Sequence, residues 1–218
     1  MIKALKGNIL DRRQYERRQS RPRQLSAEMS VLVFDIVGFS KKINNSSMMA
    51  LVETMHRAID GLLDPIYTWN EDGEGGEDNQ LVLIPTGDGY GVAFSTSIPD
   101  QEILEIARNI YLSLVKDKSL KFRMGLAKAN SIVTLDLNGN VNIFGVGIVL
   151  ATRVCNAAQT GQILVHEDFA KLLLQASEVK ELRKVPTLVA KHGLPLACYN
   201  YAGVYDGRRF GRARLADN

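Results

Sequence analysis

Short apolar runs and stretches of helical spacing alternate along the chain, which predicts a domain built from both strands and helices. Apolar or alternating runs typical of strands occur at residues 31–34, 81–84, 90–94, 121–127, 132–137, 141–144, 162–165, 187–190 and 196–205. Apolar residues at helical spacing occur at 47–63, from Asp100 onwards, at 146–158 and at 168–174. Asp-Gly at 88–89 and Asn-Gly at 138–139 each separate two apolar runs and therefore predict hairpins.

The order of these elements indicates a fold class. Strand, helix, hairpin, helix and strand follow one another up to residue 127, and further elements follow. This is the β-α-β-β-α-β order of an α+β, ferredoxin-like core, here with C-terminal additions. In such a sheet the first strand and the first hairpin can lie side by side at the centre.

The distribution of charge divides the chain into three parts. Net charge is only +3, but arginines crowd residues 1–28 and 206–218, which we interpret as basic arms flanking a domain at 29–205. The arms lack a recognition-helix pattern and an aromatic ladder, so we predict solvated or dimer-docking arms and no nucleic-acid partner. Cys155 and Cys198 have no motif spacing, which favours reduced thiols. With no signal peptide and no apolar run longer than 143–151, we expect a cytoplasmic protein without a membrane partner.

Two acidic residues are the strongest candidates for chemistry. Asp35 ends the apolar run at 31–34, where an ionised carboxylate needs a cation or hydrogen bonds; the alternative role is a cap of the next helix. Asp88 lies at the tip of the first hairpin, where an aspartate by itself is usually a turn residue. If the two meet, divalent cations would relieve their repulsion, and oxygen ligands suit Mg²⁺ or Mn²⁺. Residues 37–40 (Val37, Gly38, Phe39 and Ser40) could offer backbone N–H groups to a polyphosphate.

Three stretches carry a resemblance to a known family. Residues 34–40 read Phe-Asp-Ile-Val-Gly-Phe-Ser, residues 86–89 read Thr-Gly-Asp-Gly, and residues 145–153 run from Gly to Ala-Thr-Arg. In this order they resemble class III nucleotidyl cyclase domains, over about residues 29–203. The resemblance implies a head-to-tail homodimer with its active sites at the interface. There, the ribose 3′-oxygen of a nucleoside triphosphate attacks the α-phosphate and pyrophosphate leaves.

The resemblance also implies roles for individual residues. Asp35 and Asp88 would bind two divalent ions, Mg²⁺ or Mn²⁺, with the Ile36 carbonyl as a further ligand. Arg153 of the second subunit would stabilise charge on the phosphoryl group, a fixed guanidinium where negative charge develops. Lys191 has the spacing of the family's phosphate-binding lysine, without its glycine pattern.

Departures from the family pattern bear on the substrate. Ile84 stands where adenine-selective members carry a lysine, and Asn142 where they carry an aspartate. Ile84 and Asn142 also differ from the glutamate and cysteine that guanine-selective members of the family carry. The pattern resembles the pyrimidine cyclases of the bacterial Pycsar anti-phage system, whose cyclic UMP or cyclic CMP acts on an effector. The candidate base-recognition residues are Ile84, Thr86, Asn142 and Phe144.

The identity of the base and the activity itself each leave alternatives open. The Asn142 amide complements either uracil or cytosine, so UTP is favoured over CTP without a deciding residue, and Asn142 could instead be a solvent-facing strand residue. Val149 replaces the asparagine that orients the ribose in the family, which favours a non-catalytic nucleotide sensor. A divergent adenylate or guanylate cyclase that contacts the base through its backbone is the other alternative.

Overall fold

The computed structural model describes residues 25–39, 49–50, 52–57, 59, 81–115, 121–136, 141–176, 181–190 and 193–201. The basic arm up to residue 24, the basic tail, Ser40 and Lys191 lie outside this part of the chain. Of the helix expected at 47–63, the described residues 49–50, 52–57 and 59 are helical. In the described part, no helix combines the length and the apolar character that crossing a bilayer requires.

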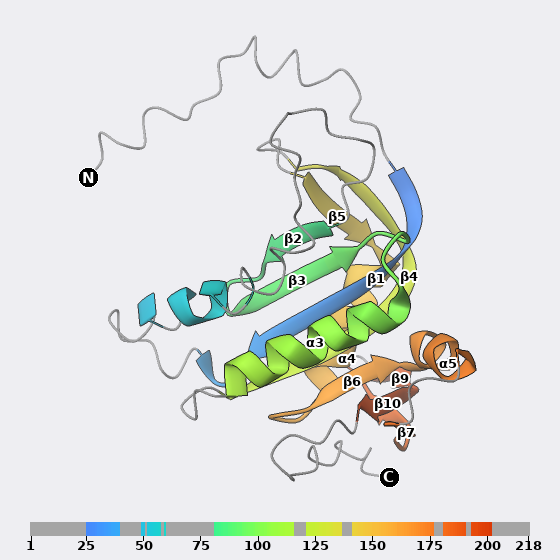
Figure 1. Ribbon diagram of the computed structural model, residues 1–218. Coiled ribbons are helices and arrows are strands. Elements are labelled where there is room, and N and C mark those ends of the chain that lie inside the picture. Colours follow the sequence, from blue (N-terminus) through green and yellow to red (C-terminus); the bar gives the residue numbers. More distant parts are fainter. Residues whose placement is uncertain are drawn as a thin grey trace.

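A central mixed sheet and the helices α3, α4 and α5 form the main part of the described domain (Figure 1). The strands of this sheet are β1 (Leu25–Ile36), β2 (Leu81–Pro85), β3 (Gly89–Phe94), β4 (Phe122–Leu135), β5 (Val141–Gly145), β6 (Ile163–His166), β7 (Leu182–Lys184) and β10 (Cys198–Tyr201). The helices are α3 (Asp100–Val115), α4 (Val146–Ala157) and α5 (Glu167–Gln175). A separate small hairpin pairs β8 (Leu188–Val189) with β9 (Pro195–Leu196).

Strand β1 lies inside the sheet, whose order is β2-β3-β1-β4-β6-β10-β7, with β5 paired to β4. It runs antiparallel to both β3 and β4, whereas β4 and β6 are parallel. The first strand and the first hairpin are therefore neighbours, as the element order led us to expect. The chain is α+β, with a strand order of β2-β3-β1-β4 in its N-terminal part.

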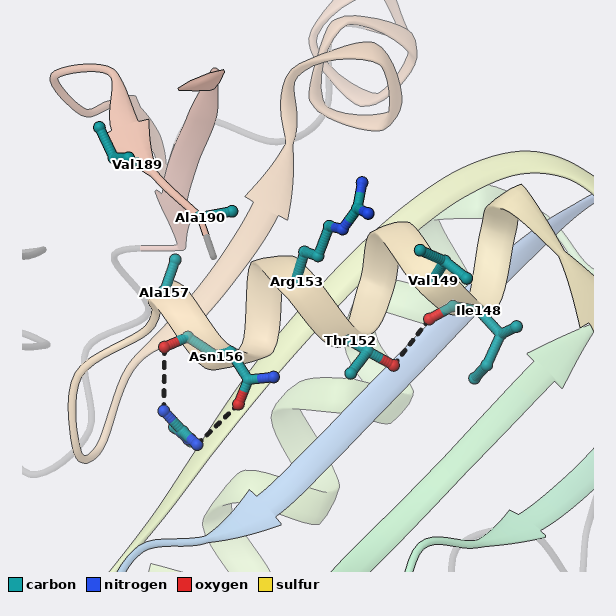
Figure 2. A pocket seen from close by; sticks show the side chains of 9 residues that line it. Ile148, Val149, Thr152, Arg153, Asn156, Ala157, Val189 and Ala190 are labelled. Atoms are coloured by element: carbon teal, nitrogen blue, oxygen red, sulfur yellow. Dashed lines mark hydrogen bonds between the residues drawn. The ribbon is translucent and has the colours of Figure 1, made fainter. Parts of the chain in front are cut away.

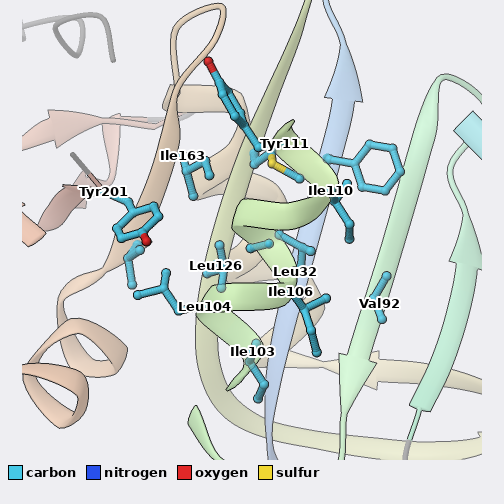
Figure 3. Packing of buried hydrophobic residues seen from close by; sticks show 14 of the residues in the cluster. Leu32, Val92, Ile103, Leu104, Ile106, Ile110, Tyr111, Leu126, Ile163 and Tyr201 are labelled. Atoms are coloured by element: carbon cyan, nitrogen blue, oxygen red, sulfur yellow. The ribbon is translucent and has the colours of Figure 1, made fainter. Parts of the chain in front are cut away.

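The two faces of the sheet bury two different sets of side chains. Leu32 and Phe34 of β1 point to the face covered by α3, where Ile103, Ile106 and Ile110 pack on the strands (Figure 3). Val31 and Val33 point to the opposite face, which α4 covers. Because side chains alternate along a strand, Asp35 belongs to the α4 face.

Helix α4 contacts β4 at close range because residue 125 is a glycine. A Cβ at Gly125 would lie 2.7 Å from the Ala151 carbonyl oxygen and 2.7 Å from the Cys155 Cα. Larger residues at this position would hold the helix away from the sheet. The helix backbone therefore rests directly on the strand.

Several strands differ from those expected. Strand β1 begins at Leu25, inside the range assigned to the basic arm. A search for apolar runs does not find its first half, because Ser26, Glu28 and Ser30 alternate there with apolar residues. The runs at 121–127 and 132–137 are one 14-residue strand, β4, which pairs with β1 from Leu25 to Ile36. The expected strand at 196–205 is divided into β9 and β10, and β7 was not expected.

Candidate active site

The end of β1 places Asp35 between two neighbouring strands. Its register partners are Gly89 on β3 and Arg123 on β4. A Cβ at Gly89 would collide with the Phe34 carbonyl oxygen, so only glycine allows β3 to approach β1 this closely. The close approach brings the turn before β3 next to the Asp35 carboxylate.

Asp88 lies in that turn. Its carbonyl oxygen accepts a hydrogen bond from the Ile36 N–H at 3.0 Å, and the turn is closed by a bond from the Thr86 N–H to the Gly89 carbonyl at 3.0 Å. Burial raises the pKa of the Asp35 carboxyl above its ordinary value, and the nearby Asp88 carboxylate adds to this shift. The two acids, distant in sequence, thus lie close enough to interact.

Arg123 pairs with Asp35, a contact that the sequence reasoning missed. Its Nε and Nη2 groups both donate to Asp35 Oδ2, at 2.8 and 2.6 Å, and this pairing opposes the rise in the pKa of Asp35. The other side of the guanidinium donates to Asn156 on α4, to the carbonyl oxygen at 2.9 Å and to Oδ1 at 2.8 Å. The available signal was an arginine between Phe122 and Met124 in the otherwise apolar run at 122–127.

The donor set at this site fits a hard divalent cation only in part. Among the described residues, no group of three or more His, Cys, Asp or Glu side chains could hold a metal ion. Two carboxylates and the Ile36 carbonyl are oxygen donors, and Mg²⁺ in proteins is commonly held by one or two carboxylates together with the phosphates of a substrate. Asp35 and Asp88 therefore fit a cation that is shared with a polyphosphate rather than caged by the protein.

The segment after β1 offers fewer phosphate donors than expected. The Val37 N–H donates to the Lys121 carbonyl at 2.6 Å, so in this conformation it is engaged by the protein itself. Gly38 has a φ of +76°, a conformation that favours glycine, and it is exposed. Phe39 packs against the core on the α3 face.

Arg153 projects from α4 into an open groove of about 690 Å³ (Figure 2). The helix contributes most of the lining, and Val189 and Ala190 of the β8 region form the facing wall. Arg123 also lines this groove, which therefore borders the Asp35 ion pair. Val149, at the position of the family's ribose-orienting asparagine, lines it as well and is 47% exposed.

The candidate base-recognition residues lie on β2, on β5 and in the β2–β3 turn, and β2 and β5 come near each other without pairing. Ile84 on β2 packs against the apolar cluster beneath α4, and Ile143 on β5 belongs to this cluster. Asn142 and Phe144 flank Ile143 on β5, so strand alternation directs them away from that cluster. The structure thus places Ile84 and Asn142 on neighbouring elements without joining their side chains on one face. Thr86 is exposed in the β2–β3 turn.

Asn142 already makes a local hydrogen bond. Its Oδ1 accepts from the Ile143 N–H at 2.8 Å, so the acceptor half of the amide is engaged in this conformation. Phe144 is 49% exposed beside its cross-strand neighbour Ile132. Both residues are therefore within reach of a ligand approaching from solvent.

The fold is that of known cyclase catalytic domains. No family model and no curated protein matches the chain. Among solved structures, the adenylyl cyclase CyaB from P. aeruginosa aligns with a TM-score of 0.63 and 16% identity, over 85% of this chain and 98% of that one. The guanylate cyclase domain of RhGC from Catenaria anguillulae in complex with GTP aligns with a TM-score of 0.63 and 17% identity, over 81% of this chain and 97% of that one. A structure of adenylate cyclases from Trypanosoma brucei in their monomeric state aligns with a TM-score of 0.66 and 16% identity, over 88% of this chain and 95% of that one. At these identities the likeness establishes a shared fold.

Proposed function

We propose that this protein is a nucleotide cyclase that converts a nucleoside triphosphate to its 3′,5′-cyclic monophosphate and pyrophosphate. The observation that carries the proposal is the meeting of Asp35 and Asp88 at the end of β1, beside the groove that holds Arg153. The shared fold with adenylate and guanylate cyclase domains and the strand order of a ferredoxin-like core support it.

The proposed mechanism assigns each residue one task. Asp35 and Asp88, with the Ile36 carbonyl, would hold two Mg²⁺ or Mn²⁺ ions, and such ions activate an attacking oxygen and neutralise a leaving pyrophosphate. The exposed Gly38 turn lies beside these acids, where the triphosphate would bind. Arg153 would stabilise charge developing on the phosphoryl group, and Lys191 would contact the phosphates.

We further propose a head-to-tail homodimer, in which each active site combines the acids of one subunit with Arg153 of the other. Exposed apolar side chains gather around the start of α4, where Phe144 is 49%, Val146 60% and Val149 47% exposed. Burying such residues against a second copy would remove apolar surface from water.

For the substrate we propose UTP, with CTP second, and a product that serves as a second messenger in anti-phage defence. Ile84 has no side-chain group to hydrogen-bond a purine. The partly buried Asn142 keeps its N–H donors and the second lone pair of Oδ1, the first being engaged by the Ile143 N–H, and these complement the polar edge of a pyrimidine. The departures from the purine-reading pattern and the resemblance to pyrimidine cyclases support this assignment.

A panel of the four nucleoside triphosphates with Mn²⁺, analysed by mass spectrometry, tests the substrate. Cyclic UMP as the main product is expected, and cyclic AMP as the main product would overturn the pyrimidine assignment.

We expect Asp35→Ala and Asp88→Ala to abolish turnover. The matched control is Asp168→Ala, which removes a carboxylate that is 70% exposed on α5. Full activity in either variant of the acid pair would remove the metal scheme.

One observation favours a second candidate function. Val149 supplies no hydrogen bond where the family orients the ribose, so the domain would bind nucleotide without cyclising it. Binding of UTP and Mn²⁺ by calorimetry, with no cyclic product from any of the four triphosphates, would establish this sensor role.

A further inference from the structure

Lys121 lies where β4 begins, at the end of the sheet that carries the two acids. Its carbonyl oxygen accepts a hydrogen bond from the Val37 N–H at 2.6 Å. Because Ile36 is the register partner of Phe122, this bond extends the pairing of β1 and β4 by one residue. Lys121 is therefore held opposite Val37, the residue that leads into the exposed Gly38 turn.

The side chain of Lys121 belongs to the face of the sheet that α4 covers. Phe122 and Met124 are buried on the opposite face, and Arg123 between them bonds to α4. Since side chains alternate along a strand, Lys121 shares its face with Arg123 and with Asp35, the ion-pair partner of Arg123. Residues two apart on one face of a strand lie about 7 Å from each other, a distance that the four-carbon stem of a lysine spans. The Lys121 ammonium therefore reaches the surroundings of the Asp35 carboxylate.

This ammonium is available to an anion. The neighbouring Arg123 guanidinium is engaged on both sides, by Asp35 and by Asn156. Lys121 is exposed, and no carboxylate among the described residues forms an ion pair with it. A lysine ammonium is a compact charge with three donors, and lysine is a common ligand of phosphate groups. An anion at the Gly38 turn therefore lies beside a cation that the described part of the chain leaves unpaired.

We propose that Lys121 binds the terminal phosphates of the nucleoside triphosphate, from the same subunit as the acid pair Asp35–Asp88. The inference rests on the proposed function, in which the reacting α-phosphate lies at the two acids. Lys121 stands two residues beyond Arg123, toward the Gly38 turn, so its charge serves the β- and γ-phosphates that leave as pyrophosphate. It transfers no proton and forms no bond to the reacting atoms.

Binding of inorganic tripolyphosphate with Mn²⁺, measured by calorimetry, tests this contact without a base and without turnover. We expect Lys121→Gln to weaken this binding about 10-fold, the effect of losing one solvent-accessible hydrogen bond between charged groups. Lys121→Arg keeps a cation of similar reach and should retain most of the affinity. Binding of UMP with Mn²⁺ should be equal in Lys121→Gln and in the unaltered protein, because UMP lacks the terminal phosphates.

Lys171→Gln is the matched control. The side chain of Lys171 is 54% exposed on α5, where it pairs with Glu167 at 3.3 Å, and its substitution changes the net charge by the same amount. Helix α5 follows β6, whose parallel pairing with β4 places the end of β6 away from Asp35. This variant should bind tripolyphosphate as tightly as the unaltered protein. Both lysines are exposed, so we expect both variants to fold.

The outcomes separate this inference from the proposed function. The inference is overturned by tripolyphosphate binding in Lys121→Gln that is no weaker than in Lys171→Gln, by a loss in Lys121→Arg as large as in Lys121→Gln, or by an equal loss for UMP. Weaker tripolyphosphate binding in Lys121→Gln, with no cyclic product from any of the four triphosphates, would remove the cyclase and keep Lys121 as a phosphate ligand. Cyclic product together with unchanged tripolyphosphate binding would keep the cyclase and remove this role of Lys121.

Discussion

Substituting Gly89 by alanine tests whether the closeness of β1 and β3 builds the acid pair. The new Cβ would collide with the Phe34 carbonyl oxygen, lie 2.9 Å from the Phe34 carbonyl carbon and lie 3.0 Å from the Asp35 Cα. All three are backbone atoms of the central strand, which β4 holds from the other side. They cannot move aside as the end of a flexible side chain would.

The expected loss of stability follows from that contact. Overpacking of a core costs about 1–3 kcal/mol, and we place Gly89→Ala near 3 kcal/mol because only backbone can yield. For a protein of this size, each kcal/mol lowers the melting temperature by about 2–4 °C, so we expect a fall of about 6–12 °C. Circular dichroism during heating measures it.

A matched glycine separates collision from backbone strain. Gly193 has a φ of +73° and no heavy atom within 4 Å of the position that a Cβ would take. Alanine there should cost only the left-handed conformation, about 1 kcal/mol. If the melting temperature of Gly89→Ala is no lower than that of Gly193→Ala, the close approach of β1 and β3 does not depend on a glycine at residue 89.

Three further predictions concern buried polar and titratable groups. Lys128→Met removes an ion pair that joins β4 to Asp100 at the start of α3, with a closest approach of 2.8 Å, and should lower the free energy of unfolding by about 1–2 kcal/mol in urea titrations; a double-mutant cycle with Asp100→Asn showing no coupling would contradict it. Burial lowers the pKa of His166 below its ordinary 6.5, so the unfolded chain takes up the proton first and stability should fall as the pH drops below 6.5; His166→Asn should flatten this dependence in denaturant titrations between pH 5 and 8. Burial raises the pKa of the Cys198 thiol to about 12 and that of Cys155 also well above its usual range, so neither thiol should react with iodoacetamide at pH 8 until urea unfolds the protein; mass spectrometry showing fast labelling of the native protein would refute this.

The spacing of apolar residues and the residue types in the turns predict much of the sheet. The Asp-Gly hairpin after β2, the helix from Asp100 and α4 all follow from local pattern, and their order predicts that β1 adjoins β3. The first half of β1 was missed because its polar residues look like those of a solvated arm. This half of β1 pairs only with β4, from Leu25 with Val133 to Met29 with Ala129, so its partners lie 100 to 108 residues further along the chain. Local sequence does not report such a partner.

The candidate site shows the same division. The sequence identifies Asp35 and Asp88 as candidates, because the first ends an apolar run and the second lies at the tip of a predicted hairpin. It does not show that Arg123 neutralises the first of them, since that contact depends on the register between β1 and β4. Nor does it show that the Val37 N–H is engaged by Lys121, because backbone bonds between distant segments leave no trace in residue type.

The contact between α4 and β4 at Gly125 restricts how this protein could be switched on. Because helix backbone lies against strand backbone there, α4 with Arg153 and β4 with Arg123 must move together as a rigid unit. Sliding α4 along the sheet would drive main-chain atoms into each other. In the homodimer proposed above, an activator is therefore expected to tilt or separate whole subunits, and crosslinks between the two subunits should fix the activity at one level, whereas crosslinks within one subunit should not.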